Sequence, residues 1–364
     1  MLEPGQITSK QLIRLLVCSR IVIALTYFPV LKEMSPSQDA WLACILYFPL
    51  QIIMAAPLYL LAKRFPQQTI IQYIPAIAGK GGKIAGALLL GYFIHQSAMS
   101  LALFNLFITG VTMPETPILF FSSSLLLACA YAARQGIEVL GRLSELLLPI
   151  ILIAITTIIL LLTKDMHFKL LQPVLEKGIL PVMGGSLFLV SRTYEVIEFA
   201  MLLPYLNQPA KTKTVYLTSF FIIAFFLTMI SMSIIAILGT GAATRTFPFL
   251  YTIRLVSVGN FIERIESIHL AVWILAAFLK MSLQYYIIIL GLSQLFNLKS
   301  YKSLILPTGS ILVSLSLLVA PSLVELQSFA SSMESHLYNI VFVYSLPFLL
   351  LLLAVIRKKG VRSP

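Results

Sequence analysis

The chain has 364 residues, of which 59% are hydrophobic and 11% are charged, and its formal net charge is +12. Soluble domains carry about 25% charged residues, so this composition excludes a water-soluble globular protein. The basic residues are scattered between apolar runs, which argues against a nucleic-acid partner and favours topology signals and contacts with anionic membrane lipid.

Few residues offer metal or cofactor chemistry. Cys18, Cys44 and Cys129 stand inside apolar runs without the spacing of a metal site, and their odd number argues against a disulfide framework. The glycine-rich run AGKGGK (78–83) lacks the spacing of a phosphate-binding loop. We therefore expect no metal and no cofactor.

A helix needs about 20 mostly apolar residues to cross a bilayer. Ten segments meet this need, with gaps rich in Pro, Gly and charge: residues 9–31, 40–62, 83–109, 117–133, 143–163, 180–204, 214–239, 266–296, 303–320 and 337–356. The alternation typical of a β-barrel is absent. The sequence predicts an all-α, polytopic membrane protein with about ten transmembrane helices, forming one transmembrane domain over residues 1–364.

The distribution of Lys and Arg predicts the orientation. With the N-terminus inside, the inner segments hold a clear excess of these residues, so we expect both termini in the cytoplasm. Ten spans divide into two sets of five, residues 1–163 and 180–356. An odd number of spans per half forces the second half to insert upside down, as in inverted-repeat transporters.

The sixth predicted span carries three charges, Arg192, Glu195 and Glu198, at successive i, i+3 steps. On a continuous helix they share one face and partly neutralise one another. A charge at bilayer depth needs a partner or a polar cavity. Two interpretations stay open, a structural ion pair and the wall of a pocket or ion path.

The eighth span places Glu266, Trp273, Lys280 and Gln284 on one helix face. Lys280 lies about 21 Å along the helix from Glu266, too deep to reach the outer surface easily. We expect this face to contact protein or water, with Lys280 holding the span to a carboxylate such as Glu195 or to backbone carbonyls of a broken span. A purely structural bridge is the alternative.

Two further spans carry polar faces. The third span has Tyr92, His95, Gln96 and Met99 on one face, which indicates a pocket wall, although a lone His is more often a packing residue than a proton relay. Its glycines at 82, 86 and 91 favour close helix packing. In the fifth span, Glu145 can meet Arg142, or Arg20 of the first span. The segment 245–261 is amphipathic and is predicted to form a short outer helix or lid.

Three stretches resemble the B subunit of spore germination nutrient receptors, the spore permease family of the amino acid–polyamine–organocation transporter superfamily. They are LQPVLEKGILPV (171–182), MLLPYL (201–206) and the long FPFLYTIRLVSVGNFIERIESIHLAVWILAAFLK (247–280). The resemblance covers nearly the whole chain and is densest over 171–205 and 247–297. Its most specific piece is the F-x-E-R-x-E-S run, here Phe261 to Ser267.

The resemblance implies a LeuT-like 5+5 inverted repeat in which spans 1 and 6 are discontinuous and line a small-ligand pocket with spans 3 and 8. The ligand-binding residues it implies, together with the polar faces, are Val22, Ala24, Tyr92, His95, Gln96, Tyr194, Glu195, Lys280 and Gln284. Structural or coupling charges are expected at Arg20, Glu145, Arg192, Glu198, Glu263, Arg264 and Glu266. The family also implies A and C subunits as partners, in the inner membrane of the dormant spore.

The chain departs from the family pattern at two glycine positions. Relatives usually break span 1 at Gly-x-Gly before Leu-Pro, whereas this chain reads Val22-Ile23-Ala24 and then Leu25-Thr26-Tyr27-Phe28-Pro29. In span 6, Tyr194 replaces a glycine and Glu195 keeps the acid. These changes predict either a smaller pocket or a ligand other than a simple amino acid.

The sequence thus predicts a germinant receptor B subunit that binds a small nutrient, by resemblance an amino acid, and signals germination through its partners. The alternative is an amino-acid or polyamine permease, proton-coupled through His95, Glu195 or Glu198. No HExxH, no GxSxG and no paired cysteines at a membrane surface support an enzyme.

Overall fold

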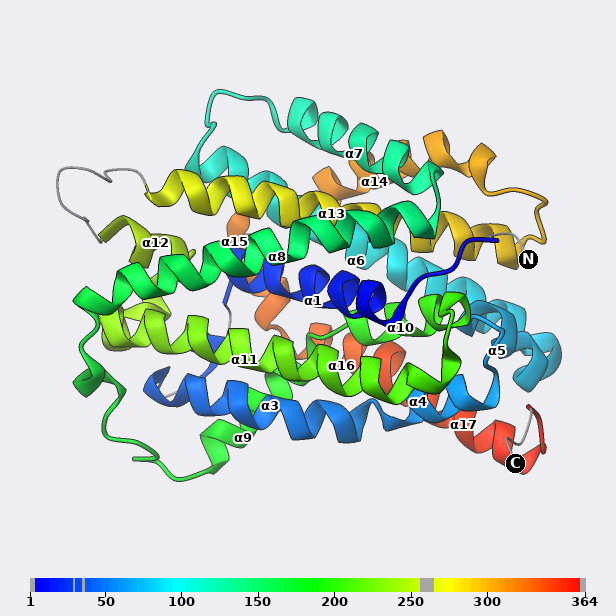
Figure 1. Ribbon diagram of the computed structural model, residues 1–364, viewed down its shortest axis with the longest axis horizontal. Helices are drawn as coiled ribbons and strands as arrows, with labels where there is room; N and C mark the ends of the chain where they lie inside the picture. The colour runs from blue at the N-terminus through cyan, green and yellow to red at the C-terminus, as the bar shows by residue number, and fades with distance from the viewer. Residues whose placement is uncertain (1–3, 29, 35–36, 256–264, 361–364) are drawn as a thin grey trace.

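The computed structural model describes residues 4–28, 30–34, 37–255 and 265–360, which form helices and loops with no β-strand longer than an isolated bridge (Figure 1). The helices are α1 (Ser9–Thr26), α2 (Val30–Glu33), α3 (Ala40–Met54), α4 (Ala56–Arg64), α5 (Ile70–Ala78), α6 (Gly82–Val111), α7 (Ile118–Arg134), α8 (Ile137–Leu162), α9 (Leu180–Ser191), α10 (Glu195–Leu202), α11 (Thr212–Leu238), α12 (Pro248–Leu255), α13 (Ile265–Leu295), α14 (Ile305–Val319), α15 (Leu323–Ser331), α16 (Met333–Ile340) and α17 (Leu346–Ile356). A π-helical turn, Val341–Ser345, joins α16 to α17.

Seven helical segments of the described chain are long and apolar enough to cross a membrane: Ser37–Arg64, Gly82–Val111, Ile137–Asp165, Pro209–Thr244, Glu266–Leu295, Lys302–Val319 and Met333–Ile356. They coincide with seven of the ten predicted spans. The chain is therefore a polytopic helical membrane protein. The other three predicted spans correspond to α1, to the short apolar helix α7, and to α9 followed by α10. The number ten stays a prediction.

Two of these shorter spans are interrupted helices. In the span predicted over 180–204, α9 ends at Ser191 and α10 begins at Glu195. The Thr193 hydroxyl donates to the Leu189 carbonyl at 2.8 Å, and the Ser191 hydroxyl donates to the Phe188 carbonyl at 2.8 Å. Side-chain hydroxyls that donate to nearby carbonyls compete with the backbone hydrogen bonds of a helix. Both of these hydrogen bonds are found where α9 ends.

In the first span, α1 continues to Thr26, and Tyr27 is already extended, with φ −138° and ψ 126°. A break at Val22–Ala24, where the family resemblance places one, is therefore not found, because these residues are helical. Without glycine at these positions, a non-helical backbone conformation costs more conformational energy, so the helix continues. The helix ends instead just before Pro29, whose ring disfavours helical geometry in the residue preceding it.

The bundle is built around α1. This helix packs against α8, α11 and α13, while α3 packs against α9 and α11, and α14 packs against α6 and α7. Most helices run along the long axis of the molecule, and the first and last described residues lie at the same end of it (Figure 1). Within the predicted outer segment 245–261, α12 packs against α11 and α13. Residues 256–261 of this segment lie outside the described part.

Glycine permits one close contact of α6. A Cβ atom at Gly82 would lie 2.5 Å from the Cα of Pro75, a backbone atom of α5, whereas at Gly81 and at Gly91 a Cβ would meet nothing within 4 Å. Of the three glycines predicted to favour close packing, Gly82 lets the α5 backbone approach α6 directly, and a Cβ at Gly86 would be in ordinary contact with the Leu295 side chain of α13 at 3.5 Å.

We expect Gly82→Ala to lower the free energy of unfolding by about 1–3 kcal/mol, because the added methyl overpacks a rigid backbone contact. Gly81→Ala is the matched control, since its Cβ enters open space and alanine favours the adjoining helix. Both are to be measured by unfolding in mixed micelles followed by circular dichroism. Equal stability of the two variants would contradict the contact.

Candidate functional site

A lysine inside the bundle joins three helices. The ammonium of Lys280, on α13, lies 2.8 Å from Oε1 of Glu195, the first residue of α10. It also donates to the backbone carbonyl of Ser19 on α1 at 2.9 Å and contacts the Ser19 hydroxyl at 3.2 Å. Lys280 is 0% exposed and Glu195 is 1% exposed. The predicted tether is confirmed: Lys280 binds both the carboxylate and a backbone carbonyl.

A second carboxylate, Glu198, completes this group. Its Oε1 accepts from the Gln284 amide at 3.0 Å, and its Oε2 accepts from the Ser19 hydroxyl at 3.3 Å. Both side chains are buried. We call Ser19, Glu195, Glu198, Lys280 and Gln284 the charged cluster. Every member is hydrogen-bonded to another member, as buried polar groups require.

The face predicted for α13 is confirmed at three positions. The Trp273 indole donates to the Thr26 hydroxyl of α1 at 2.6 Å, Lys280 contacts Ser19, and Gln284 contacts Glu198. All three α13 side chains are buried. Helical periodicity therefore identifies a stripe that packs on α1 and α10. Glu266, at the start of the stripe, lines a separate pocket with Arg254.

Two predicted charge groupings are wrong. Arg192, Glu195 and Glu198 do not share a helix face, because the helix is interrupted between Ser191 and Glu195. Glu195 instead binds Lys280 and lies 3.9 Å from Nη1 of Arg20.

Glu145 meets neither Arg142 nor Arg20 as its ion-pair partner. It pairs with Arg14 of α1 at 3.1 Å, and Arg142 pairs with Glu138, one turn away on α8, at 3.8 Å. The partner of Glu145 lies on α1, so residue spacing within α8 does not predict it. Glu263 and Arg264 lie outside the described residues.

The polar face of α6 meets α16. The Tyr92 hydroxyl and the Gln96 amide both donate to Oδ1 of Asn339, at 2.9 and 2.6 Å. His95 stacks edge-on against Phe329 and Tyr338, with ring centroids 5.7 and 5.4 Å apart. The face therefore holds α15 and α16 onto α6, and His95 has the surroundings of a packing residue.

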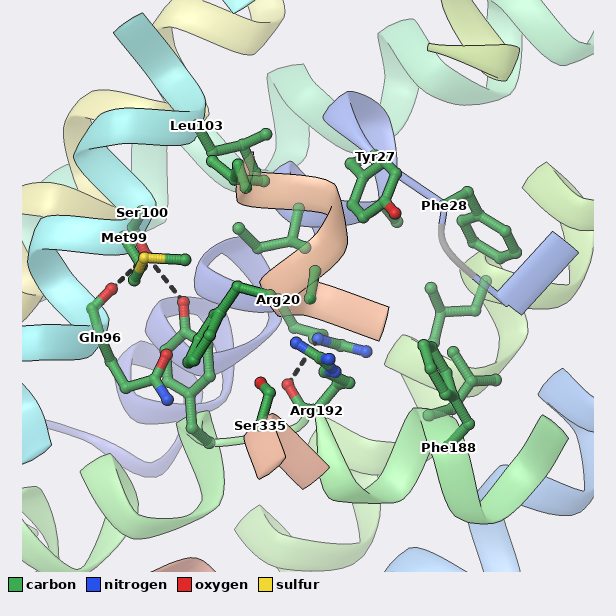
Figure 2. A pocket seen from close by; sticks show the side chains of 18 residues that line it. Arg20, Tyr27, Phe28, Gln96, Met99, Ser100, Leu103, Phe188, Arg192 and Ser335 are labelled. Carbon is green, nitrogen blue, oxygen red and sulfur yellow. Dashed lines mark hydrogen bonds between the residues drawn. The ribbon is translucent and has the colours of Figure 1, made fainter. Parts of the chain in front are cut away.

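A cavity of about 100 Å³ lies beside the charged cluster. The described residues that line it come from the end of α1, from α6, from both sides of the α9–α10 interruption, from α11 and from α15–α16; they are Arg20, Ile23, Ala24, Tyr27, Phe28, Gln96, Met99, Ser100, Leu103, Phe188, Leu189, Arg192, Tyr194, Leu227, Leu326, Phe329, Ala330 and Ser335. We call it the central cavity. Figure 2 shows Arg20 and Arg192 side by side within it.

Of the predicted ligand-binding residues, Ala24, Gln96 and Tyr194 line the central cavity. The others belong to its supports: Glu195, Lys280 and Gln284 to the charged cluster, Tyr92 to the Asn339 contact, His95 to the aromatic packing, and Val22 to the buried core of α1.

Tyr194 connects cavity and cluster. Its hydroxyl lies 2.8 Å from the Ser100 hydroxyl of α6, and the Lys280 ammonium lies 4.7 Å from its ring centroid. A cation over an aromatic face is favourable. Tyr194 thus fills space between the cluster and α6, which agrees with a small cavity.

Several residues of the site were not predicted. Ser19 and Asn339 each bridge two partners, and Phe188, Phe329 and Ser335 line the central cavity. Asn339 could have been suspected, because it is an amide inside the apolar tenth span. Ser19 and the two phenylalanines carry no sequence pattern that separates them from core residues. The described residues contain no group of three His, Cys, Asp or Glu side chains able to hold a metal ion.

Interrupted helices, a charged cluster buried among apolar helices and an adjoining cavity define a polytopic membrane protein with an intramembrane polar site. A family model described as spore germination protein matches residues 6–324. The chain therefore belongs to the spore permease family of spore germination proteins.

Individual relatives agree. Spore germination protein YndE of Bacillus subtilis is 28% identical over 340 residues, covering 92% of each chain. Spore germination protein KB of the same organism is 26% identical over 365 residues, covering 98% of this chain and 97% of the relative. Spore germination protein XB of Bacillus anthracis is 23% identical over 277 residues, covering 71% of this chain and 73% of the relative. None of these names describes an enzymatic activity.

We expect Lys280→Ala to lower the free energy of unfolding by about 3–5 kcal/mol, because it leaves a buried carboxylate without its partner. The double variant Lys280→Ala, Glu195→Gln should recover part of this loss, giving a coupling energy of about 0.5–3 kcal/mol. The measurement is a double-mutant cycle by unfolding in mixed micelles.

The control is the exposed pair Arg14–Glu145, whose side chains are 29% and 44% exposed. Arg14→Gln should cost about 1 kcal/mol or less. Strictly additive effects of the two cluster substitutions would show that Lys280 and Glu195 do not hold each other.

Proposed function

We propose that this protein is the B subunit of a germinant receptor, which binds a small nutrient inside the membrane and signals spore germination through partner subunits. The observation that carries the proposal is the central cavity at the interruption between α9 and α10. Membrane helices tolerate such interruptions where the freed backbone is buried in protein or lines a cavity. Membership of a germination family supplies the biological role.

We further propose a LeuT-like core of ten spans, with residues 1–163 and 180–356 as inverted repeats of one transmembrane domain. In support, the two interrupted helices, α1 and α9–α10, are each the first span of a half. Broken half-helices beside a midplane ligand site are typical of inverted-repeat transporters. The first and last described residues share one end of the bundle (Figure 1), as cytoplasmic placement of both termini requires.

The contacts of the cavity suggest how a ligand would act. Its lining residues come from the α1 end, α6, the α9–α10 interruption and α15–α16, so one bound molecule would touch all of these segments at once. A ligand shifts a conformational equilibrium only if it binds one state more tightly than the other. We propose that closure of α15–α16 over the ligand is this difference, passed to A and C subunits in the spore inner membrane.

A permease for amino acids or polyamines is the second candidate, because Glu195 and Glu198 place two buried carboxylates next to the cavity. Intramembrane carboxylates are typical of ion-coupled transporters. In that case the cavity would release its ligand to the other side of the membrane.

We expect deletion of the gene in its spore-forming host to abolish nutrient-triggered germination for one nutrient class while leaving vegetative uptake unchanged. The measurement is the fall in optical density of purified spores across a panel of amino acids, sugars and organic acids. Re-expression from another locus controls for polar effects. Normal germination together with reduced uptake of a nutrient would make the protein a permease.

The partner proposal has a separate test. The affinity-tagged protein, extracted from spore membranes in mild detergent, should carry along a membrane-anchored A subunit and a lipoprotein C subunit. An unrelated spore membrane protein with the same tag is the control. Recovery of this protein alone, with germination lost on deletion, would contradict assembly with these partners.

A further inference from the structure

An apolar groove lies on the surface of the bundle, between the α3–α4 segment and the α16–α17 segment. Its volume is about 630 Å³, compared with about 100 Å³ for the central cavity. The described lining is apolar except for Tyr344 and Ser345. We call it the lateral groove; its walls include Ile53, Pro57 and Leu60 on one side and Ser345, Phe348 and Leu349 on the other.

Two helix irregularities flank the lateral groove. α3 ends at Met54 and α4 begins at Ala56, with Pro57 in its first turn, and the π-helical turn Val341–Ser345 separates α16 from α17. Proline removes a backbone hydrogen bond and bends a helix, and π-helical turns are frequent at functional sites. The groove therefore lies where both of its walls depart from regular helix.

The lateral groove opens toward the lipid. Ile53, Leu60, Phe348 and Leu349 are 67%, 46%, 50% and 55% exposed, and both walls belong to helical segments long and apolar enough to cross a membrane. The bilayer core holds no water that could fill such a groove, and an empty groove would lose dispersion contacts along both walls. An apolar group must therefore occupy it in the membrane.

One end of the lateral groove is closed by an arginine. On α4, Arg64 follows Pro57 and Leu60 at helical spacing, so it continues the face that lines the groove. Its Nη2 donates to the Ala354 carbonyl of α17 at 3.0 Å, and its Nε donates to the Lys359 carbonyl. Figure 1 shows α4 and α17 side by side at the end of the molecule where the described chain begins and ends.

Three exposed lysines accompany Arg64 at this end. Lys63 precedes it on α4, and Lys358 and Lys359 follow the end of α17. Within the part of the chain that the structure describes, none of the three forms an ion pair with a carboxylate. Residues 40–114 and 335–360 contain no Asp or Glu. Clusters of Lys and Arg at the end of a membrane helix attract anionic lipid headgroups.

We propose that the lateral groove binds an anionic phospholipid, with one acyl chain in the groove and the phosphate at Arg64 and the three lysines. The dimensions agree, because Arg64 lies about 16 Å along the helix from Ile53, about half of the roughly 30 Å hydrocarbon core and so the depth of one leaflet. Since Arg64 uses Nε and Nη2 for the two carbonyls, its Nη1 can donate to a phosphate oxygen.

The test compares two lipids with identical acyl chains and different headgroup charge, dioleoyl phosphatidylglycerol and dioleoyl phosphatidylcholine. Each is titrated into the full-length protein in uncharged detergent micelles, and binding is measured by native mass spectrometry. We expect phosphatidylglycerol to bind at least about tenfold more tightly. Glycerol phosphate, which has the anionic group without acyl chains, should not compete. Equal binding of the two lipids, or competition by glycerol phosphate, would overturn the proposal.

The headgroup contact is tested by the triple variant Lys63→Gln, Lys358→Gln, Lys359→Gln. It should weaken phosphatidylglycerol binding at least about tenfold and leave phosphatidylcholine binding unchanged. The matched control removes three exposed lysines that belong to other predicted inner segments, through the substitutions Lys10→Gln, Lys299→Gln and Lys302→Gln. An equal loss in the control would show a diffuse attraction of the whole inner surface and would contradict a site at the groove.

The acyl-chain contact is tested by Ala56→Phe, which places an aromatic ring in the lateral groove. It should weaken the binding of both lipids, whereas Ala128→Phe, at an exposed position of α7 outside the groove, should leave binding unchanged. Unchanged lipid binding by Ala56→Phe would contradict occupation of the groove. Circular dichroism checks that the variants fold, and the comparison of lipids on the wild-type protein does not depend on them.

The occupant in the native membrane is identified by photo-crosslinking. The photoreactive analogue p-benzoylphenylalanine replaces Phe348, an exposed ring of the groove wall, and the adduct is analysed by mass. We expect an adduct with an anionic phospholipid. An adduct with a partner protein, with a second copy of this chain or with uncharged lipid alone would overturn the proposal.

Discussion

The arrangement of this protein depends on one ammonium group, that of Lys280, which must be neutralised inside a bundle of apolar helices. It is 0% exposed and binds Glu195 of α10 and the Ser19 carbonyl of α1. Removing a single partner of such a pair is far more costly than the pair itself is stabilising. The requirement therefore fixes how α1, α10 and α13 approach one another. The interruption before α10 contributes, because it makes Glu195 the first residue of a helix, where the helix dipole favours negative charge.

The position of the central cavity follows from the contacts of Lys280 with Ser19 and Glu195. Ser19 and Glu195 face the cluster, and the residues next to them in sequence, Arg20 and Tyr194, face the cavity. On α1 and at the start of α10, one residue therefore contributes its side chain to the charged cluster, and its neighbour in sequence contributes its side chain to the wall of the cavity. A ligand that displaced Arg20 or Tyr194 would also change the distance between α1 and α10. Binding and helix arrangement are coupled through shared backbone rather than through a remote pathway.

The sequence predicts those features that a continuous helix creates. Lys280, Trp273 and Gln284 lie on α13 at helical spacing, so their common face follows from the residues alone. The sequence names Glu195 only as one possible partner of Lys280, and the structure shows the pair. Spacing fails for the triplet Arg192, Glu195 and Glu198, because it assumes a helix that side-chain hydroxyls and tertiary contacts interrupt. It fails for Glu145 because Arg14 approaches from another helix. Sequence spacing cannot predict the size and lining of the cavity, because these depend on how several separate segments of the chain pack together.

The interruption also explains why the span predicted over 180–204 is not found as one long apolar helix, because it is divided into α9 and α10. A helix that ends inside the bilayer loses both length and apolar character, because the polar residues that receive its backbone groups stand at the break. Such a break is stable only when those polar groups have partners, and here the charged cluster and the Tyr194–Ser100 contact provide them.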